Sequence, residues 1–138
     1  FPKESFRAHK CCYESRREKM NEIAFLELQI KLSISPMDLM QYKKQNPTDY
    51  IVVDVRNAPP HLKKTKIAGA IDIPLTVLAE NLDKLPKDKL IIVYCWDVWC
   101  HMGKKASIML LKAGYDVKEL SGGISAWNEL NLPVESLV

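Results

Sequence analysis

The sequence predicts an α/β fold in which helices alternate with the strands of a mainly parallel sheet. Its 138 residues suit a single domain. Two continuous apolar runs, YIVVDV (50–55) and KLIIVY (89–94), are typical of strands that are buried on both faces of a parallel sheet. Weaker strand patterns alternate with helix patterns around these two runs, which is the order that a parallel α/β fold requires.

The first elements are expected before residue 50. A helix is predicted over 14–29, with these apolar positions on one face: Met20, Ile23, Ala24 and Leu28. A short strand over 31–35 follows. The next helix has Ser35 as its N-cap and Pro36 at its first position. It should end before Pro47, because the residue that precedes a proline avoids the helical conformation.

The elements after the strand over 50–55 alternate regularly. Strands are predicted over 69–74, 89–94 and 117–120, and helices over 75–85, 101–112 and 124–130. We expect two parts in the chain: an N-terminal extension with one amphipathic helix over 1–32, and an α/β domain over 33–138.

Composition argues against several classes of function. The net charge of +3 is mild, and the basic clusters SRREK (15–19), HLKKTK (61–66) and HMGKK (101–105) are interpreted as solvated faces, so no nucleic-acid partner is expected. No apolar run approaches the roughly 20 residues of a membrane helix, and the charged start of the chain is unlike a signal peptide. Four cysteines are too few for a disulfide scaffold, which favours a cytoplasmic location.

The stretch YCWDVWCHMGKK (94–105) holds the strongest candidate site. Cys95 directly follows the strand over 89–94, and ligands of parallel sheets bind beyond the carboxyl ends of strands. A loop that leads into a helix offers backbone N–H groups and a positive helix end, which lower the pKa of a thiol and hold an anion. Three basic residues are candidates for electrostatic or substrate contacts, and Asp97 works against them: His101, Lys104 and Lys105.

Several interpretations of the clustered residues stay open. Cys95 and Cys100 are separated by four residues rather than the two of a thioredoxin motif, and with His101 they fall short of four zinc ligands. A second small set is His9, Cys11 and Cys12. We predict no metal and no cofactor. Cys100 is either a thiol that resolves an oxidised or persulfidated Cys95, or a small buried residue, and the two tryptophans of the loop are interpreted as packing residues or pocket walls.

Five stretches in order resemble the rhodanese (sulfurtransferase) family. They are ISPMDLM (34–40), IVVDVR (51–56), KIAGAIDIP (66–74), IIVYC (91–95) and GYDVKELSGGISAW (114–127). The last is the most specific of them. The resemblance implies a five-stranded parallel sheet flanked by helices on both faces, to which this chain adds an N-terminal helix.

The resemblance also implies roles for individual residues. Cys95 would carry sulfane sulfur as a persulfide, cradled by the backbone N–H groups of the loop residues: Trp96, Asp97, Val98, Trp99 and Cys100. Asp54 and Arg56 match positions that brace the scaffold near the site, and Arg56 is also a candidate substrate contact. Gly122 and Gly123 would form the tight turn that leads from the last strand into the final helix.

Some residues depart from the family pattern. Lys66 replaces a histidine and Thr65 a glycine, and His61 stands near the usual position of an acid. Val98 occupies a position where many members have glycine, and Cys100 one that is often arginine, serine or threonine. With Asp97 and two tryptophans, this loop suits the thiosulfate dianion poorly. A protein or a low-molecular-weight persulfide is therefore the expected donor.

We accordingly expect a single-domain sulfurtransferase that passes sulfur from Cys95 to a thiol or another nucleophilic acceptor. One alternative is a non-catalytic or redox-sensing binding module that uses Cys95 and Cys100. A phosphatase or arsenate reductase is disfavoured, because phosphoryl transfer needs an arginine where this loop is followed by His101. The apolar face of the helix over 14–29 must pack on its own domain or on another chain, so a homodimer through this helix is a candidate assembly.

Overall fold

The chain divides into two compact units, Phe1–Lys31 and Leu32–Val138, which we call the N-terminal unit and the C-terminal unit. The computed structural model describes residues 2–138, with side chains from Ser15 onward. Among the described residues no helix combines the length and the apolar character needed to cross a membrane.

The N-terminal unit is a single helix, α1 (Pro2–Lys31). It begins at Pro2 rather than near Glu14, where the sequence pattern first becomes periodic. Residues 3–13 contain neither glycine nor proline, so they can extend the helix although they lack an apolar stripe. The side chains of His9, Cys11 and Cys12 lie outside the described part of the chain.

The C-terminal unit is built on the predicted five-stranded parallel sheet, in the order β1-β6-β5-β2-β4. Its strands are β1 (Ser33–Ile34), β2 (Tyr50–Asp54), β4 (Ile71–Asp72), β5 (Leu90–Tyr94) and β6 (Val117–Leu120). The central pair β2 and β5 is in register, with Asp54 opposite Tyr94. The carboxyl ends of these two strands therefore lie side by side, and Arg56 follows one end by two residues while Cys95 directly follows the other.

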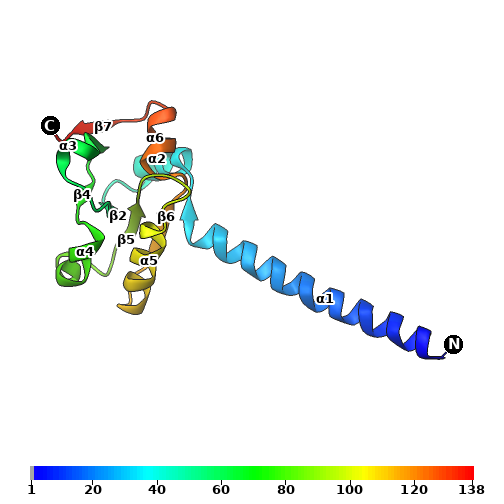
Figure 1. The fold of residues 1–138 in the computed structure, drawn as a ribbon. Helices are drawn as coiled ribbons and strands as arrows, with labels where there is room; N and C mark the ends of the chain where they lie inside the picture. Colours follow the sequence, from blue (N-terminus) through cyan, green and yellow to red (C-terminus); the bar gives the residue numbers. More distant parts are fainter. Residues whose placement is uncertain (1) are drawn as a thin grey trace. The chain divides into compact units, whose positions relative to one another are not determined.

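Helices surround the sheet (Figure 1). They are α2 (Pro36–Gln45), α3 (Pro60–Lys63), α4 (Leu75–Leu78), the 3₁₀ helix η1 (Ala79–Lys84), α5 (Met102–Lys112) and α6 (Gly123–Glu129). The predicted N-cap is confirmed, since Ser35 Oγ accepts the Asp38 N–H at 3.1 Å. The helix predicted over 75–85 tightens into a 3₁₀ helix after Leu78, and α3 forms where a loop was expected.

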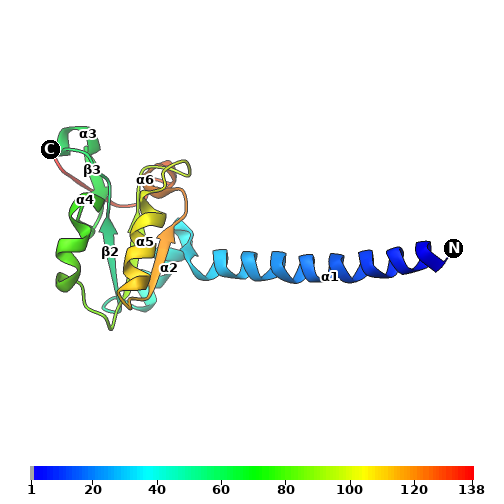
Figure 2. The same cartoon turned by 60° about the horizontal axis from the view of Figure 1, so that its bottom comes forward.

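Alternate residues of β2 and β5 pack against helices on opposite faces of the sheet. Val53 and Val93 join a core cluster that includes Leu78 of α4 and Leu110 of α5. Figure 2 shows the corresponding strand and helices, β2, α4 and α5, in a second view. Residues one position away along the strands, among them Val52 and Ile92, enter a second cluster, which includes Leu39 of α2 and Trp127 of α6. This burial on both faces explains why the two strands are continuous apolar runs.

A second, two-stranded sheet was not predicted. β3 (Thr65–Ile67) pairs antiparallel with β7 (Val134–Ser136), which brings the C-terminal segment beside α3 and β3 (Figure 1). Both strands are short and carry charged side chains, so neither produces a recognisable apolar alternation. The interpretation of HLKKTK as a solvated face is wrong for Lys63, whose buried ammonium pairs with Asp72 at 2.7 Å.

Candidate active site

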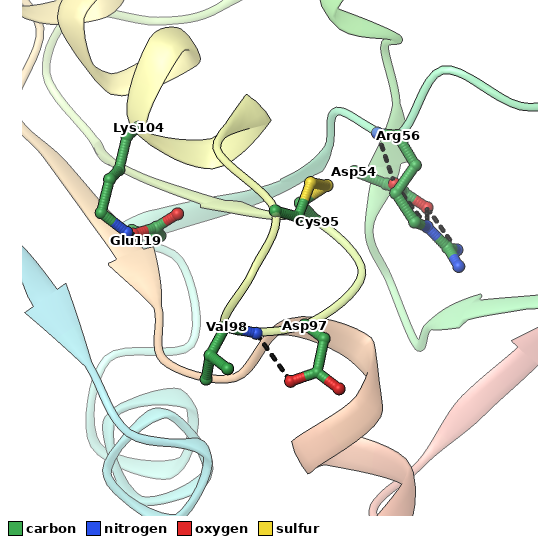
Figure 3. The surroundings of a disulfide bond; sticks show 8 residues. Asp54, Arg56, Cys95, Asp97, Val98, Lys104 and Glu119 are labelled. Atoms are coloured by element: carbon green, nitrogen blue, oxygen red, sulfur yellow. Dashed lines mark hydrogen bonds and ion pairs between the residues drawn. A yellow bond between two sulfur atoms is a disulfide. The ribbon is translucent and has the colours of Figure 1, made fainter.

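The loop from Cys95 to Cys100 connects the carboxyl end of β5 to the start of α5. The structure joins Cys95 and Cys100 in a disulfide, with their Cα atoms 6.3 Å apart. The two cysteines are 3% and 5% exposed, whereas Val98 and Trp99 are 75% and 68% exposed. Figure 3 shows the disulfide at the base of the loop and Asp97 and Val98 at its far end. The sulfur atoms are therefore shielded by a loop whose tip faces solvent.

Asp97 organises the tip of the loop. Its carboxylate Oδ1 accepts the N–H of Val98 at 2.6 Å, and its carbonyl oxygen accepts the N–H of Cys100 at 3.0 Å. The second bond closes a β-turn that directs the chain back toward Cys95. Two of the N–H groups expected to cradle an anion are thus bonded within the loop in the disulfide form. The cradle itself stays a prediction.

The base of the loop is anchored to α6. Cys95 O accepts the N–H of Ile124 and Trp96 O accepts the N–H of Ser125, both at 3.0 Å. Gly123 has a φ of +58°, and a Cβ placed there would lie 2.5 Å from Cys95 O. The preceding Gly122 also has a positive φ, of +78°. Glycine at both positions therefore permits the tight turn between β6 and α6, and the missing side chain of Gly123 lets this turn approach the cysteine loop closely.

Asp54 and Arg56 form a buried ion pair beside the loop. Arg56 donates from Nε and Nη2 to the Asp54 carboxylate at 3.0 and 2.7 Å, and from Nη2 to Thr65 O at 2.6 Å. Arg56 also lies over the Trp96 ring, with its Cζ 4.6 Å from the ring centroid. This geometry fits a brace that links the end of β2 to β3 and to the first residue of the loop after Cys95.

Tyr94 extends this network from β5. Its hydroxyl donates to Asp54 Oδ2 at 3.0 Å and accepts the N–H of Ile67 at 3.0 Å. Burial, followed by the nearby Asp54 carboxylate, raises the pKa of Tyr94 above its usual value, which keeps the hydroxyl protonated as a donor. The side chain immediately before Cys95 is therefore fixed to the neighbouring strand.

A pocket of about 290 Å³ opens beside the loop. Its lining residues come from the segment after β2, from α3, from the loop and from α6: Arg56, Lys63, Trp96, Asp97, Trp99, Ile124, Ser125 and Asn128. Both cations in this lining are already paired, Arg56 with Asp54 and Lys63 with Asp72. Asp97 contributes a further negative charge to the lining, and Trp96 and Trp99 contribute aromatic surface. The pocket wall therefore carries no excess of positive charge.

The basic residues predicted near the loop are spread around it. Lys104 pairs with Glu119 of β6 at 3.0 Å, and Figure 3 shows this pair on the opposite side of Cys95 from Asp54 and Arg56. A carboxylate therefore offsets the charge of Lys104. His101 precedes α5 as its N-cap residue, and both it and Lys105 are exposed. For these two residues an electrostatic role stays a prediction.

Sequence reasoning missed several residues around the site. Lys63, Ser125 and Asn128 line the pocket, but Lys63 was interpreted as part of a solvated face, and neither Ser125 nor Asn128 was singled out as a site residue. Tyr94 had a weak signal, since it is a polar-tipped residue at the end of a buried strand and such hydroxyls find partners. Among the described residues no group of three or more His, Cys, Asp or Glu is placed to hold a metal ion.

Comparisons with known proteins agree with this architecture. A family model described as a rhodanese-like domain matches residues 35–130. A protein named sulfurtransferase from Allochromatium vinosum is 30% identical over 62% of this chain and 78% of its own length. An HTH-type transcriptional regulator, Rv0324 of Mycobacterium tuberculosis, is 35% identical over 67% of this chain, a match that spans 41% of the regulator.

Solved structures of rhodanese-related and other proteins share the fold of this chain. A full-length protein from Lactobacillus plantarum superposes with a TM-score of 0.80 at 35% identity, covering 86% of this chain and 98% of that one. A rhodanese-related protein from Thermoplasma volcanium has a TM-score of 0.65 at 32% identity, covering 75% and 97%. Residues 35–130, which the family model matches, include β5, the loop from Cys95 to Cys100 and the turn at Gly122 and Gly123. The chain belongs to the rhodanese-like domain family.

Proposed function

We propose that this protein is a sulfurtransferase that carries sulfane sulfur as a persulfide on Cys95. The observation that carries the proposal is the position of Cys95, buried at the carboxyl end of β5 at the start of a loop that leads into α5, within a rhodanese-like domain. The relative named sulfurtransferase supports the same activity. The disulfide must first be reduced, because only a thiolate is a nucleophile.

The reaction then has two steps. The Cys95 thiolate attacks the outer sulfur of an organic persulfide, the sulfur–sulfur bond of the donor breaks, and the donor leaves as a thiolate. In the second step an acceptor thiolate attacks the outer sulfur of the Cys95 persulfide. The acceptor takes that sulfur and Cys95 returns to its thiolate form.

The pocket wall favours an organic persulfide over thiosulfate as donor. Trp96 and Trp99 offer apolar surface to the organic part of such a donor. The Asp97 carboxylate repels a dianion, and the charges of Arg56 and Lys63 are already offset by aspartates. We therefore expect a higher kcat/KM with a low-molecular-weight organic persulfide than with thiosulfate.

Transfer to an added thiol tests the proposal. The reduced chain is incubated with an organic persulfide and an acceptor thiol, and the sulfane sulfur that reaches the acceptor is measured. Cys95→Ser should lower transfer to the uncatalysed rate, whereas Cys11→Ser, a cysteine change in the N-terminal unit, should leave it unchanged. Equal transfer by the Cys95→Ser variant and the unsubstituted chain would refute the role of Cys95.

A second candidate function is a redox-sensing binding module. The Cys95–Cys100 disulfide favours it, and so does the relative that is named a transcriptional regulator. Such a module would form the disulfide with a mild oxidant such as hydrogen peroxide and transfer no sulfur to a thiol. The acceptor assay separates the two functions, because a sensor gives the same background rate with and without Cys95.

A further inference from the structure

We infer that Cys100 discharges the Cys95 persulfide within the same loop, releasing the carried sulfur as hydrosulfide and leaving the Cys95–Cys100 disulfide. The inference rests on the proposed function of Cys95 and assigns a second residue to that site. It predicts a product, hydrosulfide, and a further class of reactant, a dithiol that reduces the disulfide.

The geometry of the loop supports this step. The Cα atoms of Cys95 and Cys100 lie 6.3 Å apart, within the range that a disulfide spans, and the two sulfur atoms are bonded. The turn closed by the Cys100 N–H and Asp97 O returns the chain toward Cys95. The Sγ of Cys100 can therefore reach the Sγ of Cys95 with the backbone as it stands.

Both ends of the loop are held, so the two cysteines stay close together. Cys95 is fixed through its carbonyl oxygen to α6, and Cys100 is followed by His101, whose carbonyl oxygen accepts the N–H of Lys105 in the first turn of α5. Reaction between groups held in this way proceeds as though the local thiol concentration were very high. Both cysteines are also buried, whereas an external thiol must enter past the loop.

The step balances without an added oxidant. The Cys100 thiolate attacks the inner sulfur, Sγ of Cys95. The bond between Sγ and the outer sulfur breaks, and the outer sulfur leaves with that electron pair as hydrosulfide. The hydrosulfide proton is the one already on the persulfide, or is taken from water when the persulfide is ionised. The sulfane sulfur is reduced and the two cysteines are oxidised to the disulfide. A dithiol then returns both cysteines to thiols and becomes a disulfide itself.

The sulfur carried on Cys95 thus has two fates: transfer to an acceptor thiol, or release as hydrosulfide. An acceptor thiol that reaches the outer sulfur first takes it as a persulfide. Without such an acceptor, Cys100 ends the cycle with hydrosulfide. Access of the acceptor past the exposed Val98 and Trp99 would decide between transfer and discharge.

A single-turnover experiment without acceptor tests the inference. The reduced full chain is mixed with glutathione persulfide, and hydrosulfide and the intact protein mass are followed together. We expect about one equivalent of hydrosulfide above the Cys95→Ser background, with formation of the Cys95–Cys100 disulfide. In the Cys100→Ser variant hydrosulfide release should be at least about 100-fold slower, because the intramolecular thiol is missing. Cys12→Ser, the matched control, should behave like the unsubstituted chain.

Two further readouts separate this role of Cys100 from a structural one. The Cys100→Ser variant should accumulate a persulfide on Cys95 and should still transfer sulfur to an added thiol, which a damaged site would not do. Cys100→Ala serves as a second variant if the serine variant does not fold.

The outcomes distinguish the inference from the proposed function. If the unsubstituted chain keeps its persulfide as long as the Cys100→Ser variant does, the inference is wrong while the function of Cys95 stands. If the variant instead accumulates a mixed disulfide between Cys95 and glutathione, the hydrosulfide came from the donor directly, and discharge by Cys100 is also wrong. If no variant with Cys95 gains sulfur, the proposed function itself fails.

Discussion

The two residues on either side of Cys95 are both held by the buried ion pair Asp54–Arg56. Tyr94 before it bonds to Asp54, and Trp96 after it stacks on Arg56. Asp54 and Arg56 are fully buried and bonded to one another. The ion pair therefore acts on the cysteine through the two residues on either side of it, and its loss should affect stability first.

Asp54→Asn tests this brace. The substitution removes the charge that offsets the buried Arg56, so we expect the free energy of unfolding to fall by about 3 to 5 kcal/mol in urea titrations. Lys104→Ala is the matched control: it breaks the pair with Glu119 near the exposed start of α5 and should cost less than about 1 kcal/mol. Equal losses in the two variants would contradict a bracing role for the buried pair.

Residue types alone could identify Cys95 but not its surroundings. The cysteine follows a buried strand and faces the ligand-binding edge of the sheet, and both properties can be derived from sequence. Arg56 pairs with Asp54, the last residue of β2 and two positions before it, and this pairing depends on side-chain directions that no spacing specifies. The burial of Lys63 likewise depends on α3 and β4 lying together, because its partner Asp72 belongs to β4.

At the level of elements, the close contact between the β6–α6 turn and the cysteine loop is the feature that shapes the site. The bonds from Ile124 and Ser125 to the carbonyl oxygens of Cys95 and Trp96 require the turn to lie almost against the loop. Gly123 permits this approach through both its positive φ and its missing side chain. A methyl group at position 123 should therefore push the cysteine loop away from the start of α6.

Gly123→Ala should therefore impair sulfur loading as well as stability. We expect a loss of about 1 to 3 kcal/mol from the positive φ alone, and slower formation of the Cys95 persulfide because of the clash with Cys95 O. Gly114→Ala is the control, since Gly114 has a φ of +89° but open space around the added Cβ. It should lose stability only through its positive φ and should load at the normal rate. Normal loading by Gly123→Ala would contradict the account.

The elements that the sequence predicted well are those that bury a regular apolar face. The runs over β2 and β5 record such burial in their residues, and the start of α2 was recognisable because Ser35 caps it. β3 and β7 are too short and too polar to do so, and the change from α4 to η1 depends on packing rather than on composition. The start of α1 was missed because residues 3–13 form a helix without an apolar stripe, so their sequence shows no helical period.

At the level of the whole molecule, every residue of the proposed site lies in the C-terminal unit. The N-terminal unit is a lone helix with exposed apolar side chains, among them Ile23, Leu26 and Ile30 at helical spacing. A single helix cannot bury such a face by itself. We propose that α1 joins two copies of the chain.

The substitutions Ile23→Asp and Leu26→Asp test this assembly. Together they place charges on the apolar face of α1, so light scattering should show a dimer for the unsubstituted chain and a monomer for the double variant. Loading of Cys95 should be unchanged, because the substitutions lie outside the C-terminal unit. The control is Gln29→Asp, which adds a negative charge on the side of the helix that carries Glu18 and Glu22 at helical spacing. A monomeric unsubstituted chain would contradict the proposal.

The most direct test of the central claim is the mass of Cys95 after exposure to a sulfane donor. The reduced Cys100→Ser variant is incubated with glutathione persulfide, digested without reductant and analysed by mass spectrometry. The account predicts a peptide in which Cys95 carries the mass of one additional sulfur atom. An unmodified Cys95, or added sulfur confined to Cys11 and Cys12, would contradict it.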